Sequence, residues 1–331
     1  MIETALWAAI ALIVVAYIFD FTNGFHDAAN SIATVVATKT LTPLQAVSVA
    51  AFFNFVIMFF INFKVAAVIG KGIVDPHGVT LYVVFGCLAG AIVWNLITWW
   101  LGMPTSSSHA LIGGLVGSAV TANGWAAVNE AGLNKILVFI VAAPVIGFVL
   151  GAVLNTIVRT IFGKESDMKD KWFRRLQLVS SSCYSMGHGA NDAQKTAGIV
   201  FLILLASGLI GADDAVPMWA IWTSFLVMGL GTLVGGWRIV QTLGFKLTQL
   251  NPRQGFAAEA GGSVMLFTAS AMGVPVSTTH VITGSILGTG ASEPKANVKW
   301  KKAGEIVLAW VLTIPCSALM GSAFYYISRH I

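Results

Sequence analysis

Two short elements, at 102–109 and 273–280, combine glycine, proline, hydroxyl-bearing residues and histidine in the same order. Proline sets an extended approach after which a helix can begin, and hydroxyl groups can cap that helix. The free N–H groups and the positive dipole end of a helix N-terminus favour an anion. The alternative is that these hydroxyl groups bond back to their own helices. Because the pattern recurs, we predict an oxyanion site formed by Ser106, Ser107, Ser108, Ser277, Thr278 and Thr279.

Two aspartates occupy a second pair of related segments, GFHDAANS at 24–31 and GANDAQKT at 189–196. A carboxylate in such apolar surroundings costs several kcal/mol unless it is paired. Each aspartate could cap a broken helix, and Asp192 could pair with Lys195. Because carboxylate, amide and hydroxyl oxygens suit a hard cation, we predict a sodium site. Its expected ligands are Asp27, Asn30, Asn23, Asp192, Asn191 and, from the segment GFAAEAGGS, Glu259.

Lys195 stands where the first segment has Asn30, so the two sites differ in charge. Its ammonium could neutralise Asp192 or contact the anion. We place Lys195 and its neighbour Gln194 among the anion ligands.

Other polar residues also fall in apolar segments. Asn54 is expected to lie opposite Glu259, and Asp20 is a further candidate for that position. Histidine can relay protons, and a neutral, hydrogen-bonded histidine can also hold a loop. Both roles fit the histidines of the repeated motifs, which are His26, His109, His188 and His280.

Enzymatic chemistry has no residues to support it. The sequence has no nucleophile turn with a Ser-His-acid order, no phosphate-gripping P-loop and no Cys/His metal spacing. Cys87, Cys183 and Cys316 are widely separated among apolar residues, which fits packing. We therefore expect neither an enzyme nor an ATP-driven machine, and no cofactor.

Membrane helices must position these residues. The 331 residues are 56% hydrophobic and 10% charged, whereas a soluble domain carries about 25% charged residues. Apolar runs of roughly 20 residues recur along the chain, without the ten-residue alternation of a barrel. We predict an all-α polytopic membrane protein with about 10 to 12 membrane segments. The net charge is +5, and the basic residues gather in short connections. This distribution is typical of residues that orient a protein in the membrane and does not indicate nucleic-acid binding.

Four shorter pieces rich in Gly, Ser and Thr are expected to be broken or re-entrant helices. They lie at 24–37, 105–121, 184–195 and 276–290. The N-terminus has neither a basic region nor a cleavage site, so no removable signal peptide is expected.

The motif pairs indicate a duplication, because they repeat at nearly one spacing. Asp27 and Asp192 are 165 positions apart, and His109 and His280 are 171 apart. Internal repeats in a polytopic protein point toward transporters. The basic residues between the halves place their connection on the cytoplasmic side. We divide the single domain 1–331 into a first half, 1–162, a cytoplasmic connecting loop, 163–175, and a second half, 176–331.

Both motif pairs resemble the signatures of the inorganic phosphate transporter (PiT) family, and the likeness covers essentially the whole chain. GANDAQK at 189–195 is similar to the bacterial form of the second signature, whereas the first reads Gly24-Phe25-His26-Asp27 in place of Gly-Ala-Asn-Asp. Glu259 matches an acidic residue that follows a Gly-Phe pair in the family, and Asn54 stands where many relatives have glutamate. The resemblance implies an inverted repeat and a homodimer, and we expect the protein in the inner (plasma) membrane.

Charge then constrains the function. The negative charge of phosphate together with that of Asp27, Asp192 and Glu259 far exceeds the single positive charge of Lys195. In a low-dielectric cavity this imbalance is prohibitive, so cations or protons must enter with the anion. We expect sodium-coupled phosphate symport by alternating access. The alternatives are proton-coupled symport of a metal–phosphate complex, a sulfate permease and, from another class, a channel or a non-transporting anion receptor.

Overall fold

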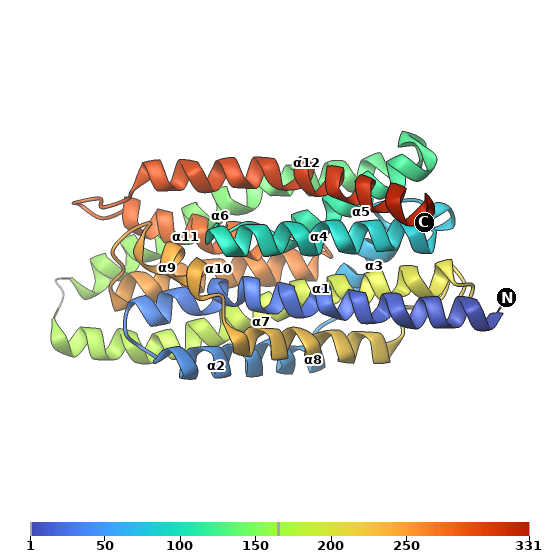
Figure 1. Ribbon diagram of the computed structural model, residues 1–331. Coiled ribbons are helices and arrows are strands. Elements are labelled where there is room, and N and C mark those ends of the chain that lie inside the picture. Colours follow the sequence, from blue (N-terminus) through green and yellow to red (C-terminus); the bar gives the residue numbers. More distant parts are fainter. Residues whose placement is uncertain (1, 164–165, 331) are drawn as a thin grey trace.

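The computed structural model describes residues 2–163 and 166–330, and within them the chain forms twelve α-helices joined by short connections (Figure 1). The first six are α1 (Ile2–Ala37), α2 (Pro43–Val56), α3 (Lys64–Lys71), α4 (Leu81–Leu101), α5 (Ser107–Asn123) and α6 (Glu130–Phe162). The second six are α7 (Asp167–Ala206), α8 (Met218–Val234), α9 (Trp237–Phe245), α10 (Pro252–Ala271), α11 (Thr278–Ala291) and α12 (Trp300–His330). The predicted all-α fold is confirmed.

The helices differ in whether they can cross a membrane alone. Among the described residues, four are long and apolar enough: α1 from Leu6 onward, α4, α6 and α12. Two bent pairs could each form one further span: Pro43–Phe59 meets α3 at 85°, and α8 meets α9 at 72°. Length and apolarity thus identify four to six spans, fewer than the 10 to 12 segments expected. The remaining helices are shorter or more polar.

Two of the expected breaks are wrong. Residues 24–37 continue α1, and residues 184–195 lie inside α7, which runs unbroken for 40 residues. Their glycines serve close helix packing instead. A Cβ on Gly24 would lie 2.4 Å from the carbonyl oxygen of Met228, and one on Gly189 would lie 2.3 Å from that of Asn54. The pieces at 105–121 and 276–290 do form separate short helices, α5 and α11.

The connection between the halves is shorter than the loop predicted at 163–175. α7 begins at Asp167, so the last nine residues of that range are helical. Ser166 caps this start by accepting from the backbone N–H of Lys169, and Asp167 and Asp170 suit the positive end of the helix dipole. Residues 164 and 165 lie outside the described residues.

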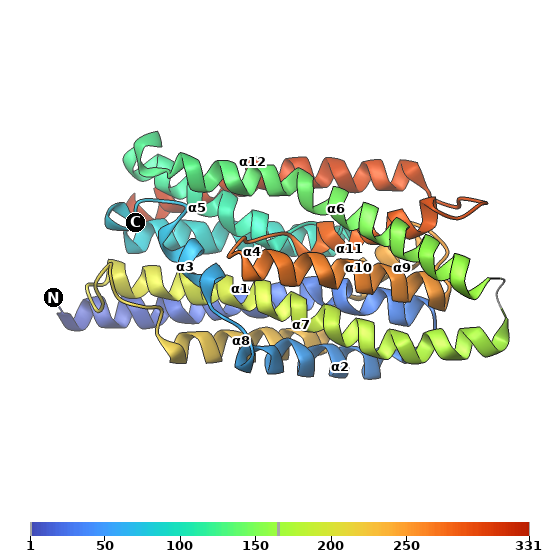
Figure 2. The same cartoon turned by 180° about the vertical axis from the view of Figure 1, so that it is seen from behind.

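The two halves interlock. α6 packs along α11, and α12 packs along α5, so each short helix is covered by a long helix of the other half (Figures 1 and 2). α1 likewise packs against α8, and α7 against α2 and α3. Pro144 inside α6 and Pro315 inside α12 are 171 positions apart, the spacing of the histidine motifs. This correspondence supports two related halves, while their inversion stays a prediction.

Buried polar residues lie midway along the molecule. The first part of α1, including Ala16 and Phe19, belongs to one apolar cluster, and the part from Ala29 to Val35 belongs to another. Between them α1 buries a polar stretch that contains Asp27. The candidate site therefore lies between two apolar layers.

Candidate functional site

α5 and α11 both begin at a capping serine. Ser106 Oγ accepts from the backbone N–H of His109 at 3.1 Å, and Ser277 Oγ accepts from that of His280 at 3.2 Å. These two hydroxyl groups thus bond back to their own helices, which is the alternative raised above. The hydroxyl groups of Ser107, Ser108, Thr278 and Thr279 instead bond to side chains of α1 and α7.

Asp27 on α1 is buried, and its shortest hydrogen bonds are to side chains of the first half. Ser107 Oγ donates to Asp27 Oδ2 and lies 2.5 Å from both that atom and Asn23 Oδ1. His26 Nδ1 lies 2.7 Å from Asp27 Oδ1, and its Nε2 lies 3.1 Å from Thr98 Oγ1 on α4. The start of α5 is therefore tied to the middle of α1.

Asp192 on α7 has the corresponding place in the second half. Thr278 Oγ1 donates to Asp192 Oδ2 at 3.1 Å, and His188 Nε2 lies 3.3 Å from the same oxygen. Lys195 Nζ donates to Asp192 Oδ1. The expected pairing of Asp192 with Lys195 is present, and it coexists with a bond to α11.

Lys195 also reaches beyond its own helix. Its Nζ donates to Ser108 Oγ at the start of α5 and to the carbonyl oxygen of Val276, just before α11, at 3.0 Å. One ammonium group thus bridges the entrances of both short helices. This is the position of a cation that would contact an anion held between them.

Side chains of the two halves form hydrogen bonds with each other where α1 meets α11. Asn30 Nδ2 donates to Thr278 Oγ1 at 3.2 Å and to Thr279 Oγ1 at 2.9 Å, and Thr279 Oγ1 lies 3.4 Å from Asp27 Oδ1. Asn30 Oδ1 is buried and has no hydrogen-bond partner within residues 2–163 and 166–330. That oxygen is available to a ligand.

Three buried groups converge at the centre. One ligand atom each from Asp27, His188 and Asp192 lies within 4.8 Å of the others. The structure thus brings together the two aspartates that the repeat predicted. It adds His188, which precedes Asp192 by one helical turn.

Gln194 and Asn191, two further predicted ligands, bond to backbone groups. Gln194 Oε1 accepts from the backbone N–H groups of Val65 and Ala66, at 3.1 and 3.2 Å, so it caps α3 and is not retained as an anion ligand. Asn191 donates to the carbonyl oxygen of Val274 and accepts from the N–H of Val276, both at 3.1 Å. It holds the chain that leads into α11. Gln194 thereby satisfies N–H groups that the start of a helix leaves open.

Glu259 belongs to a separate polar cluster. Its Oε1 accepts from Gln177 Nε2 at 3.0 Å, and its Oε2 accepts from Ser180. Gln177 Oε1 accepts in turn from Thr38 at 2.8 Å and Thr40 at 2.7 Å. This cluster joins the end of α1 to α7 and α10, apart from the paired aspartates.

Asn54 bonds to partners other than Glu259. Its Nδ2 donates to Thr232 Oγ1 at 3.0 Å, and its Oδ1 lies 3.2 Å from His188 Nδ1. Asn54 thereby orients the imidazole whose other nitrogen faces Asp192. The sequence motif contained His188, but nothing in it marked Thr98 or the carbonyl of Val276 as partners.

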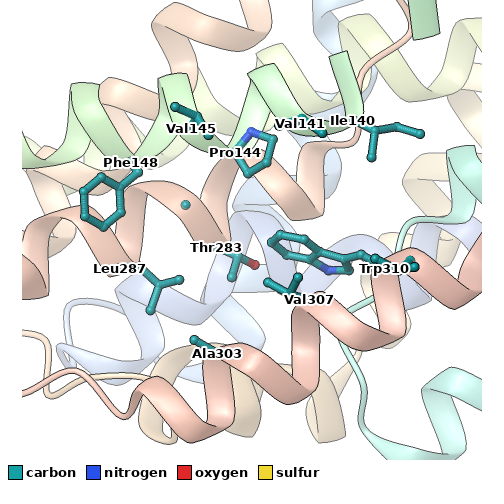
Figure 3. A pocket seen from close by; sticks show the side chains of 12 residues that line it. Ile140, Val141, Pro144, Val145, Phe148, Thr283, Leu287, Ala303, Val307 and Trp310 are labelled. Carbon is teal, nitrogen blue, oxygen red and sulfur yellow. The ribbon is translucent and has the colours of Figure 1, made fainter. Parts of the chain in front are cut away.

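An apolar groove of about 350 Å³ lies between α6, α11 and α12, away from these groups (Figure 3). Trp310 lines it, stacks on His280 with ring centroids 3.8 Å apart, and donates to the carbonyl oxygen of Pro104. His280 meets His109 edge to face at 4.7 Å. His109 and His280 thus pack against each other and against Trp310 behind the capping serines.

Comparisons with known proteins bear on this geometry. The family model described as the phosphate transporter family matches residues 23–321. A probable low-affinity inorganic phosphate transporter of Rhizobium meliloti (strain 1021) is 51% identical over 318 residues, covering 96% of this chain and 95% of the relative. One of Bacillus subtilis (strain 168) is 44% identical over 323 residues, 96% of each chain. A solved structure described as the sodium-dependent phosphate transporter aligns with a TM-score of 0.87 at 25% identity, covering 98% of this chain and 99% of that one.

Proposed function

The chain belongs to the phosphate transporter family, and on that premise we propose that it carries inorganic phosphate together with sodium ions by alternating access. One observation supports this most directly: buried ligand atoms of Asp27, His188 and Asp192 lie within 4.8 Å of one another. They lie where α5 and α11 begin, which are the helix ends that suit an anion.

We assign the anion to the gap between those two helix ends. Ser108 and Thr279 are equivalent first-turn hydroxyl groups, and both already bond to polar groups of the site. Lys195 joins Ser108 to the approach of α11. Together these groups offer hydroxyl donors, an ammonium and two helix dipoles to a tetrahedral oxyanion.

We assign sodium to the oxygens on the α1 side. Asp27, Asn23 and Ser107 form one oxygen cluster, and Asn30 Oδ1 adds a buried acceptor without a partner in the described part of the chain. Carboxylate, amide and hydroxyl oxygens are hard ligands. Asp192 can serve the same cation from α7.

Coupling follows from the electrostatics of the site. Two buried carboxylates face each other, and a single ammonium group bonds to one of them. An incoming phosphate would add further negative charge in surroundings of low dielectric. Sodium offsets that charge, so each ligand completes the site of the other.

Uptake of labelled phosphate into proteoliposomes tests the proposal. We expect uptake to rise with an inward sodium gradient, to saturate with phosphate, and to show trans-stimulation in counterflow. Uptake that is indifferent to sodium would overturn the coupling. Flux without saturable exchange would indicate a channel, and binding without flux would indicate a receptor.

His188 keeps a second candidate open. An imidazole nitrogen beside two carboxylates is a donor set that transition metals favour over sodium. Proton-coupled symport of a metal–phosphate complex would use that donor set. Phosphate uptake that requires Mn²⁺ or Zn²⁺ and persists with potassium in place of sodium would support this candidate. Competition by sulfate would instead support a sulfate permease.

The assembly and location that the resemblance implied remain part of the proposal. We propose a homodimer in the inner (plasma) membrane. Light scattering on the purified protein in detergent, corrected for bound detergent, would give one or two copies of the 35.0 kDa chain.

A further inference from the structure

Asp20 is a buried carboxylate outside the proposed ligand site. It lies on α1 two turns before Asp27 and is 0% exposed. Oδ1 accepts from Thr196 Oγ1 on α7 at 2.8 Å. Oδ2 is buried and has no hydrogen-bond partner among the residues that the structure describes.

The surroundings of Asp20 are apolar. Its neighbour Phe19 belongs to the apolar cluster of α1, α4 and α5, and so do Ile199 and Val200, which follow Thr196 on α7. An ionised carboxylate in such surroundings needs a compensating charge. The cation that the sequence supplies nearest on α7 is Lys195, and its ammonium bonds to Asp192, Ser108 and Val276.

The titratable groups of the neighbouring helices do not supply that charge. Tyr17, one turn earlier on α1, bonds to Thr223 of α8, and α8 itself contains no titratable residue. On α4, Cys87 donates to the carbonyl oxygen of Leu111, and Tyr82 is exposed. On α9, Arg238 donates to the carbonyl oxygen of Trp100. Asp27 and Asp192 carry charge of the same sign as Asp20.

A metal ion does not fit this position either. Hard cations take about six or more oxygen ligands, and the contacts of Asp20 provide its own carboxylate and the hydroxyl of Thr196. A proton needs no such shell, because a neutral carboxylic acid can remain in an apolar layer with one hydrogen bond at a far lower desolvation cost.

The pairing of a buried acid with a hydroxyl group, as in Asp20 and Thr196, occurs in only one of the two related arrangements. At the spacing of 165 residues, Asp20 corresponds to Ser185, and Thr196 corresponds to Ser31. Ser185 donates to the carbonyl oxygen of Ser181 in its own helix. On α1, Asp20 lies on the N-terminal side of Asp27, and α1 begins at the end of the molecule where both termini lie (Figure 1).

We infer that Asp20 is a proton-binding site, separate from the anion and sodium ligands, that is neutral when α1 and α7 are packed as in this structure. It is linked to the ligand site along both helices, through α1 to Asp27 and through Thr196 to the adjacent Lys195. Loss of the proton places an uncompensated charge between α1 and α7, and it therefore favours conformations in which water reaches Asp20 from the end with the termini.

Infrared spectroscopy of the purified protein tests the site without any assumption about the cargo. We expect the carbonyl stretch of a protonated carboxylic acid at neutral pH, lost in Asp20→Asn and kept, at a shifted position, in Asp20→Glu. Asp213→Asn, which changes an exposed aspartate at the same end, is the matched control and should leave the band unchanged. A wild-type spectrum without a band assignable to Asp20 would overturn the inference, whichever ion the protein transports.

Transport gives a second readout, which rests on the proposed function. We expect wild-type phosphate uptake to change as the pH is raised through the range in which the infrared band disappears, and Asp20→Asn to flatten that change. An Asp20→Asn profile identical to that of the wild type would show that the proton does not act on transport and would overturn the link between the sites. Sodium dependence, measured at one pH, reports separately on the proposed function.

Discussion

The ammonium of Lys195 bonds to the carboxylate of Asp192 one turn away on α7, at the positions where α1 carries Asn30 and Asp27. The two related halves therefore meet with unequal charge. The second half has its own counter-charge, whereas the first has a carboxylate held by hydroxyl and imidazole groups. This difference predicts that the two aspartates respond differently to substitution.

Replacing one partner of the Lys195–Asp192 pair should destabilise the protein more than replacing both. Lys195→Met leaves a buried carboxylate, and Asp192→Asn leaves a buried ammonium; losing one partner of a buried pair costs about 3–5 kcal/mol. The double variant should recover much of that loss. Thermal unfolding in detergent, followed by tryptophan fluorescence, measures all four proteins. Additive losses in the double variant would contradict a direct pair.

Asp27→Asn should weaken sodium dependence before it affects folding. The side chain keeps its size and can still accept from Ser107, but it loses the charge that a cation needs. We expect sodium activation of phosphate uptake to shift to higher sodium concentration, with the melting temperature nearly unchanged. An unaltered sodium curve would remove Asp27 from the cation ligands.

Ser108→Ala and Thr279→Ala should raise the apparent KM for phosphate. A hydrogen bond to a charged group contributes about 1.5–3 kcal/mol, which corresponds to about ten- to hundredfold. Ser106→Ala is the matched control, because Ser106 caps α5: it should cost about 1 kcal/mol of stability and leave KM nearly unchanged. Equal KM values in all three variants would defeat the assignment of the anion.

Gln194→Leu should lower stability without changing the apparent KM for phosphate. It removes the acceptor of the first N–H groups of α3 and leaves them buried, which costs about 1–3 kcal/mol. Uptake kinetics and thermal unfolding separate the two effects. A large rise in KM at unchanged stability would restore Gln194 as an anion ligand.

Gly189→Ala should destabilise the packing of α7 on α2. The added Cβ would lie 2.3 Å from the carbonyl oxygen of Asn54, so the helices must shift, at a cost of about 1–3 kcal/mol. Gly304→Ala is the control, because nothing within 4 Å meets its Cβ. Comparable melting temperatures for the two variants would contradict this close approach.

The sequence predicted the helical membrane fold and the site's aspartates because hydropathy and repeated motifs are local signals. Helix continuity was harder to predict, since glycines such as Gly24 and Gly189 mark a close neighbour as readily as a break. Ligand identity was harder still. Gln194 and Asn191 lie in the same motif as Asp192, yet their helical positions turn them toward the ends of α3 and α11. The role of Val276 depends on a backbone carbonyl, which no side-chain pattern reveals.

Because α12 covers α5 and α6 covers α11, neither half can complete its own packing. During synthesis the first half enters the membrane with one flank of α5 bare. That flank is covered only when the 31-residue helix α12 has been synthesised and inserted. The helix ends that we assign to the anion therefore complete their packing last, and a truncated chain that lacks α12 would leave α5 without its cover.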